Sequence, residues 1–293
     1  MTLKKTLFLS VFSAVFITGC NSGKNKETEE IPPVDSTQNT ILNVSGEIFS
    51  IPSPIQTAFL IKGSGAIYSK EFINAANKSS SYSTNFSKAL NLGIYGADLG
   101  YVTMYNQTQD AVGYLSAAKK LSDDLGVSGA FDAKTIERFT KNLGNKDSML
   151  ILVGVAYRST DTYLKTNDRN DVSGLILAGG WLESLFFTTS VYTTKPNEDV
   201  KRRIAEQKSS LQSLIKLLTQ FNSQPEYAVF VSDLNDLLIS YEKVGFKYIY
   251  EKPTTDAEKK ITTINSNTEV VISTEDIQAI SQKIKKLRSK IIA

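Results

Sequence analysis

The stretch from Gly174 to Tyr192 reads GLILAGGWLESLFFTTSVY, and it decides the fold class of this chain. It is mostly apolar, and its length is close to the ~20 residues that a helix needs to cross a bilayer. Glu183 near its centre, two adjacent glycines and several hydroxyl side chains argue against a membrane span. We therefore predict that it forms the buried central helix of a soluble domain.

Helical spacing of apolar residues continues on both sides of this stretch. Gly126 follows one predicted helix as a stop signal, and Asp132 precedes another as an N-cap. The connections are short, which favours antiparallel neighbours. We predict an all-α fold, either an antiparallel helical bundle or stacked helix hairpins. The predicted helices span residues 85–107, 108–125, 132–143, 146–166, 171–193, 197–221 and 226–242.

Both ends of the folded part depart from this helical pattern. Pro52 and Pro54 interrupt residues 48–65, which predicts an extended segment followed by a small helix around residues 56–62. Near the C-terminus, residues 260–264 and 268–272 flank a short polar turn, which predicts a small β-hairpin. A final helix follows. Its start is marked by Ser273 with Asp276 three residues later, the spacing of a capping box.

The final helix, residues 274–292, carries an apolar seam on one side and a crowd of cations on the rest. One interpretation is that the helix binds a protein partner or an anionic surface; the other is that it docks on its own domain and leaves the cations in water. The seam consists of Ile277, Ile280, Ile284, Leu287 and Ile291. The cations are Lys283, Lys285, Lys286, Arg288 and Lys290.

Composition excludes several classes of chemistry. The 293 residues include no histidine, so Ser-His-Asp and Cys-His catalysis and histidine metal sites are excluded. Cys20 is the only cysteine, so the chain can form no internal disulfide. The 33 basic and 30 acidic residues are mixed along the chain without a basic stripe, so nucleic acid is not an expected partner. We assign no cofactor, no metal and no catalytic residue.

The first residues have the layout of a secretory signal: two lysines by residue 5, a short apolar run over residues 7–17, and small residues before Cys20. Ile17-Thr18-Gly19-Cys20 resembles the lipobox of bacterial lipoproteins. The resemblance implies that residues 1–19 are removed and that Cys20 carries lipid, palmitate included. It places the chain in the bacterial cell envelope, on the outer membrane.

Residues 20–45 are predominantly polar and predict a flexible tether, followed by a single helical domain over residues 46–293. An acidic group close to Cys20 resembles the export tags of some Bacteroidota lipoproteins, which would imply exposure at the cell surface. The alternative interpretation is an ordinary solvated linker. The group consists of Glu27, Glu29 and Glu30.

Three acidic residues, Asp98, Asp161 and Glu183, fall where the helical wheel places apolar neighbours, so each is expected to face the interior. Burying an unpaired carboxylate is costly, which means that each needs a partner, a raised pKa or a ligand. Arg158 and Arg169 are the obvious partners, together with tyrosine hydroxyls and the one tryptophan.

These acids permit three interpretations. They serve structural hydrogen bonding, or they converge with Tyr95, Tyr157 and Trp181 to bind a cationic, hydroxylated or metal-bearing ligand, or two of them act as acid and base in glycoside cleavage.

The glycines Gly93, Gly96 and Gly100 lie on one side of their predicted helix, so a second backbone could approach closely there. Residues 92–103 also align loosely with residues 177–188, at an offset of 85 that matches Asp98 to Glu183. A duplicated helix pair and a chance match both remain open.

Four short motifs of the folded part resemble a group of Bacteroidota lipoproteins without an assigned activity. The resemblance implies an envelope location and an all-helical domain, and it carries no catalytic residue to this chain. We expect a membrane-tethered, non-enzymatic binding or scaffold module; the alternatives are a carboxylate-based hydrolase and a small-ligand carrier that use the three acids. The motifs are Ile51-Pro52-Ser53-Pro54, residues 93–99 (GIYGADL), Asp147-Ser148 and residues 179–183 (GGWLE).

Overall fold

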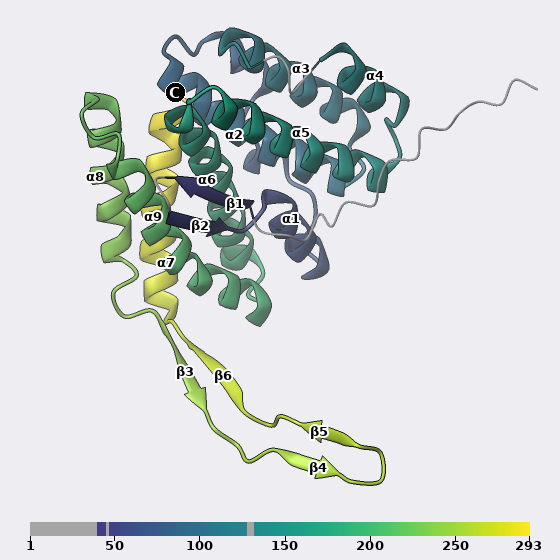
Figure 1. The fold of residues 1–293 in the computed structure, drawn as a ribbon, viewed down its shortest axis with the longest axis vertical. Coiled ribbons are helices and arrows are strands. Elements are labelled where there is room, and N and C mark those ends of the chain that lie inside the picture. Colours follow the sequence, from purple (N-terminus) through teal and green to yellow (C-terminus); the bar gives the residue numbers. More distant parts are fainter. Residues whose placement is uncertain (1–39, 45–46, 128–131) are drawn as a thin grey trace, which may run out of the picture. The chain divides into compact units, whose positions relative to one another are not determined.

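The computed structural model describes residues 40–44, 47–127 and 132–293, and helices dominate it (Figure 1). The predicted signal peptide, Cys20 and most of the predicted tether lie outside these residues. The helices are α1 (Pro54–Gly63), α2 (Asn85–Met104), α3 (Thr108–Asp124), α4 (Ala133–Lys141), α5 (Lys146–Thr166), α6 (Asn170–Thr194), α7 (Glu198–Thr219), α8 (Pro225–Ile239) and α9 (Thr274–Ile291), with 3-10 turns η1 (Lys70–Phe72) and η2 (Ala76–Ser80). The all-α class and the final helix are confirmed.

The helix boundaries follow local signals in the sequence. The side chain of Asp132 accepts a hydrogen bond from the backbone N–H of Thr135 at the start of α4. Ser273 and Asp276 form the predicted capping box at the start of α9. Gly126, just after α3, has a φ of 70°, the left-handed conformation that a glycine after a helix adopts without strain. The helix ends are therefore determined largely by neighbouring residues.

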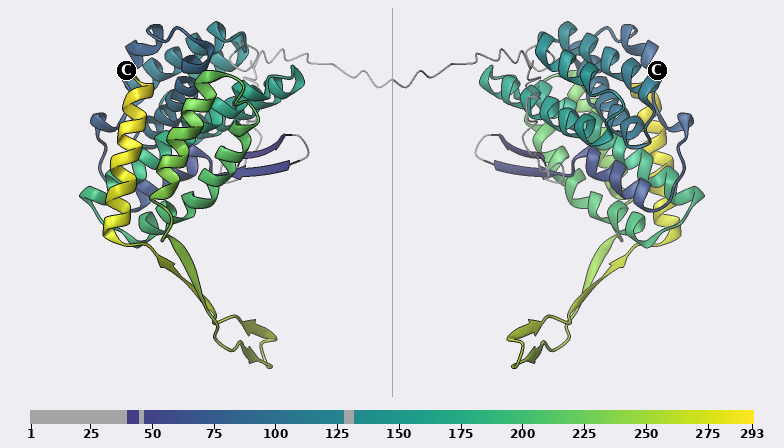
Figure 2. Two further views of the ribbon diagram at one scale, coloured as in Figure 1. Left: turned by 90° about the vertical axis from the view of Figure 1, so that its left-hand side faces the viewer. Right: turned by 90° about the vertical axis from the view of Figure 1, so that its right-hand side faces the viewer.

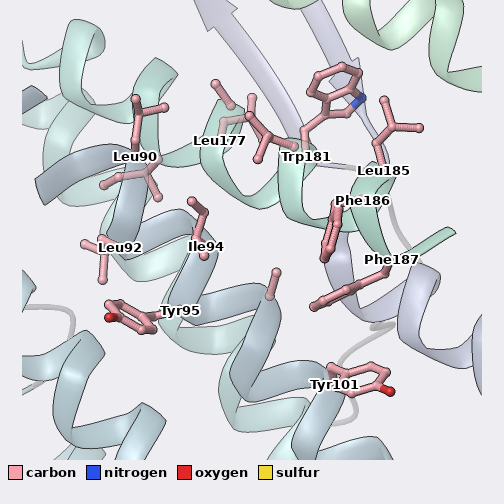
Figure 3. Packing of buried hydrophobic residues seen from close by; sticks show 14 of the residues in the cluster. Leu90, Leu92, Ile94, Tyr95, Tyr101, Leu177, Trp181, Leu185, Phe186 and Phe187 are labelled. Carbon is pink, nitrogen blue, oxygen red and sulfur yellow. The ribbon is translucent and has the colours of Figure 1, made fainter. Parts of the chain in front are cut away.

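Helix α6 is the predicted buried central helix. It packs against α1, α2, α5, α7 and α9, and every residue from Val172 to Thr189 is buried. Within the described part of the chain, α6 is also the helix whose length and composition would suit a membrane span, and the whole of its apolar window is buried. Apolar side chains of α6 such as Trp181 and Leu185 thus pack in the core (Figure 3).

Helices α2 and α6 touch through their backbones. A Cβ atom on Gly93 would lie 2.0 Å from the carbonyl oxygen of Ile176, and one on Gly179 would lie 2.0 Å from that of Leu90. The predicted close approach at Gly93 is confirmed. The other two predicted glycines differ from Gly93. A Cβ atom on Gly96 would meet the Tyr157 side chain, and a Cβ atom on Gly100 would have no neighbour closer than 3.8 Å.

The two touching helices run in the same direction. Leu90 lies against Gly179 near their N-terminal ends, and further along the ring centroids of Tyr101 and Phe187 are 4.9 Å apart (Figure 3). Positions about 85 to 89 residues apart are therefore neighbours, close to the offset of the sequence alignment. Whatever its origin, the offset places Asp98 and Glu183 at the same level of the helix pair.

The predicted C-terminal antiparallel β-hairpin region is confirmed, but it is longer than predicted and its strands pair differently. Strand β3 (Gly245–Ile249) pairs with β6 (Asn267–Val271), and β4 (Thr254–Asp256) pairs with β5 (Ile261–Thr263), all antiparallel. The predicted pairing of residues 260–264 with 268–272 is wrong: β5 and β6 lie there, but each pairs with a strand earlier in the chain. We call residues 245–271 the arm; it extends away from the helices (Figures 1 and 2).

The segment before α1 contains paired strands as well. Strand β1 (Thr40–Val44) pairs antiparallel with β2 (Glu47–Ile51), with Thr40 opposite Ile51. Strand β1 lies within the range that the sequence predicted as tether. The small helix predicted around residues 56–62 is confirmed by α1, whose first residue, Pro54, follows the N-cap Ser53.

Candidate functional site

Two of the three predicted acidic residues meet in the core. Asp98 on α2 and Glu183 on α6 are both 0 % exposed, and they are close enough that the charge of Glu183 helps to raise the pKa of Asp98. The two acids meet because the contacts at Gly93 and Gly179, about one helical turn before them, bring the two helix backbones together. The prediction that both acids face the interior is confirmed.

Arg288 of α9 reaches the same place and pairs with Glu183. Its Nε lies 2.5 Å from Oε2 of Glu183, and a terminal nitrogen lies 2.5 Å from Oε1, so the pair is bidentate. The same terminal nitrogen donates to the carbonyl oxygen of Phe72 at 3.0 Å, and the guanidinium carbon lies 4.3 Å from the ring centroid of Phe186. We call Asp98, Glu183 and Arg288 the buried charge cluster.

The predicted site does not include this arginine. One of the two interpretations of the final helix leaves its cations in water, but Arg288 is only 7 % exposed. The predicted partners are wrong too: within the described residues neither Arg158 nor Arg169 pairs with Asp98 or Glu183, and Arg169 instead donates to the carbonyl oxygen of Leu125 at 2.6 Å. A signal existed, because position 288 lies four residues after the buried Ile284 and so on the apolar side of the helix.

One arginine faces two carboxyl groups, and the pKa of each carboxyl group is raised. Burial, with the nearby charge of Glu183, raises the pKa of Asp98 well above its ordinary value, although Arg288 opposes this. Burial also raises the pKa of Glu183, against the direct effect of Arg288. Asp98 Oδ2 accepts from the N–H of Asn74 at 3.2 Å, whereas Oδ1 is buried and has no donor. A proton on Oδ1 would allow Asp98 to donate to Glu183, and the cluster would then have no net charge.

Asp161 does not join the cluster. On α5 it pairs with Lys165, 2.5 Å away, and accepts a hydrogen bond from the Ser173 hydroxyl at 2.8 Å. The structure therefore brings together two of the three predicted acids and leaves the third in a separate, partly exposed ion pair.

The predicted aromatic members of the site are hydrogen-bonded within the protein. The Tyr95 hydroxyl donates to the carbonyl oxygen of Ala75 at 2.8 Å, and the Tyr157 hydroxyl donates to that of Gly93 at 2.9 Å. The indole nitrogen of Trp181 donates to the side-chain oxygen of Gln207 at 2.8 Å. These donors hold helices and turns together, because each acceptor belongs to another element of the protein.

Two hollows of the described residues lie apart from the buried charge cluster. A pocket of about 310 Å³ lies where α2, α6 and α8 begin, lined by Phe86, Arg169, Asp171 and Tyr227 among others. A more open groove of about 700 Å³ runs between α7 and α8. Among the described residues, no group of three acids or cysteines could hold a metal ion.

Comparison with known protein families, with curated proteins and with solved structures finds no match to this chain. The interpretation of the cluster therefore depends on its own geometry. A pair of carboxyl groups that cleaves a glycoside must border a cleft that admits the sugar and water. Asp98 and Glu183 are fully buried under α9, so the geometry favours a structural role for them.

Proposed function

We propose that this protein is a lipid-anchored, non-enzymatic binding or scaffold module of the bacterial cell envelope. The lipobox-like sequence Ile17-Thr18-Gly19-Cys20 supports lipid attachment, and Cys20, the only cysteine in the chain, is the residue that would carry the lipid. Several acyl chains on one residue bind a bilayer firmly, at ~0.8 kcal/mol per buried methylene, whereas a single chain binds only marginally.

The burial of the charge cluster is the observation that supports a non-enzymatic role. The two acids that face the interior, Asp98 and Glu183, are 0 % exposed; Arg288 pairs with Glu183, and the backbone N–H of Asn74 donates to Asp98. Such a network fixes how α2, α6 and α9 pack, since each partner is costly to leave unpaired in the interior.

The distribution of exposed apolar side chains supports the binding function. Of the twelve large hydrophobic side chains that are exposed in the described residues, six lie in the arm, which is only 27 residues long. Apolar surface gathered on one element, unlike scattered single residues, is typical of an interaction site. The six are Phe246, Tyr248, Tyr250, Ile261, Ile264 and Val271.

Membrane fractionation of cells tests the anchor. The wild-type chain is expected in the detergent phase of a Triton X-114 extract, and Cys20→Ser is expected in the aqueous phase. Ser22→Ala, which leaves Cys20 intact, is the matched control and should behave as wild type. A wild-type chain that is released by carbonate washing would contradict the proposal.

Photocrosslinking in the envelope tests the binding role. A photoreactive residue is placed at Tyr248 in the arm and, as a matched control, at Val229 on α8; the two side chains are 64 % and 63 % exposed. We expect protein adducts from position 248 and none, or far fewer, from position 229. Absence of adducts at position 248 would contradict a binding function of the arm.

A further inference from the structure

The base of the arm is a two-stranded ribbon with one aromatic face. Phe246 lies opposite Val270 and Tyr248 lies opposite Thr268, while Lys247 lies opposite Glu269. Because side chains alternate along a strand, Phe246 and Tyr248 share a face, and Lys247 with Glu269 takes the other. Tyr250, just beyond β3, continues the aromatic spacing.

The two edges of this ribbon differ. On the β6 side, Arg202 of α7 donates to the carbonyl oxygen of Thr268 at 3.1 Å, and α7 contacts the strand. Within the described residues, the backbone of Gly245–Ile249 has no hydrogen bond other than its ladder to β6. Its outer edge is therefore open to another strand. Two strands alone are also marginally stable in water, so a further strand would stabilise the ribbon.

The side chains along β3 are arranged symmetrically about Tyr248. If a second β3 lies antiparallel along the open edge and is centred there, Tyr248 faces Tyr248 of the second copy and Phe246 faces Tyr250. Lys247 then faces Ile249, so no like charges oppose each other. Directly opposite aromatic and apolar pairs stabilise antiparallel sheets, whereas like-charge pairs destabilise them.

We propose that the arm docks a second copy of this chain along the β3 edge. The product is a four-stranded antiparallel sheet in the order β6, β3, β3, β6, with a two-fold axis at Tyr248 and a continuous aromatic face. This inference rests on the proposed binding function and names its partner. A two-fold homodimer is also the commonest symmetry among soluble oligomers.

The first test uses the fact that Cys20 is the only cysteine of the chain. In the full chain carrying Cys20→Ser, Tyr248→Cys introduces the only thiol, and residues directly opposite in an antiparallel pair have Cα atoms about 4.5–5.5 Å apart, within the range of a disulfide. Mild oxidation should give a covalent dimer. Val229→Cys in the same background, matched in exposure, should remain monomeric.

Sedimentation velocity in mild detergent gives a second, independent readout. The Cys20→Ser chain should sediment as a concentration-dependent dimer. The combination of Phe246→Ser, Tyr248→Ser and Tyr250→Ser should sediment as a monomer with an unchanged helical circular dichroism spectrum, because these side chains are exposed. Val271→Ser, on β6 away from the open edge, should retain the dimer.

Four outcomes overturn the proposal. The first is a monomer at every concentration without a disulfide at position 248. The second is a dimer that the triple substitution does not weaken. The third is flotation of a monomer with phosphatidylcholine vesicles that the triple substitution abolishes, which would make lipid the occupant of the aromatic face. Photoadducts at position 248 to a different protein alone would preserve the binding function and reject self-association.

Discussion

The helical body and the arm treat polar and apolar side chains in opposite ways. In the body, two acids and an arginine are buried completely or nearly so, and Glu183 pairs with Arg288 inside the core. In the arm, aromatic side chains such as Tyr248 lie in solvent, 64 % exposed. The body therefore encloses charged side chains, whereas the arm concentrates six of the twelve exposed large hydrophobic side chains of the described residues.

This difference indicates which contacts each region depends on. The body is determined by contacts within the chain, so a change at a buried group is felt in the free energy of unfolding. The arm has few contacts with the rest of the chain, so changes there are expected to affect association and to leave folding almost unchanged.

Removing the arginine should have the largest effect. Arg288→Met leaves Glu183 as a buried, unpaired carboxylate, which should lower the free energy of unfolding by about 3–5 kcal/mol in urea denaturation. Lys290→Met is the matched control on the same helix: Lys290 is half-exposed and pairs with Asp233, so about 0–1 kcal/mol is expected. Adding Glu183→Gln to Arg288→Met should recover much of the loss. A cost below about 1 kcal/mol for Arg288→Met would contradict the assigned role.

Alanine substitutions at two glycines of α2 should change the free energy of unfolding in opposite directions. Gly93→Ala places a methyl group 2.0 Å from a backbone oxygen that cannot move independently, so it should destabilise by about 1–3 kcal/mol or more. Gly100→Ala, seven residues later on the same helix, meets nothing closer than 3.8 Å and should stabilise by up to about 1 kcal/mol. Thermal unfolding of both variants measures this. Equal effects would show that α2 and α6 do not touch at Gly93.

The proton of the cluster should be visible in the pH dependence of stability. Since the pKa of Asp98 is raised in the folded chain, the stability from its protonation is complete below the ordinary value of 3.8 and is lost as the pH rises toward the folded value. The slope is at most about 1.4 kcal/mol per pH unit. Asp98→Asn cannot lose this proton, so its stability relative to wild type should increase with pH above 4.

Urea denaturation of wild type and Asp98→Asn between pH 4 and pH 8 measures that difference. The exposed Asp147→Asn on α5 serves as the control for removal of a carboxyl group, and it should follow the wild-type curve. Parallel curves for wild type and Asp98→Asn would show that Asp98 is not protonated in the folded chain.

The arm should give the smallest effect on folding. Tyr248→Ser removes an exposed side chain from a ribbon outside the body, so the free energy of unfolding of the helices should change by about 0.5 kcal/mol or less. Helical circular dichroism during urea denaturation follows the body alone. A loss as large as that of Arg288→Met would mean that the arm packs on the body and would remove the contrast between the two regions.

Much of the helical fold follows from the sequence because its signals are local. Helical periodicity, the N-cap at Asp132 and the capping box at Ser273 each depend on residues within one or two turns, and the structure confirms them. The strands of the arm were located correctly for β5 and β6 but paired wrongly, because pairing depends on residues up to 26 positions apart (Gly245 with Val271).

The candidate site was predictable only in part. The wheel positions of Asp98 and Glu183 predicted burial, and the structure confirms it, because the side of a helix on which a residue lies is fixed by spacing alone. The wheel could not show that Asp161 lies elsewhere, since the relative placement of helices is not a local property.

The sequence by itself determined the helices, their caps, the buried central α6, and the acids that point inward, because each depends on contacts within a few residues along the chain. Only the tertiary structure decided that α2 and α6 touch at Gly93 and Gly179, that Arg288 closes the cluster from α9, and which strands pair in the arm. Glu183 and Arg288 are 105 positions apart, and no periodic pattern couples residues at that separation. Their pairing arises from the packing of whole helices, which minimises unpaired charge and empty space in the core.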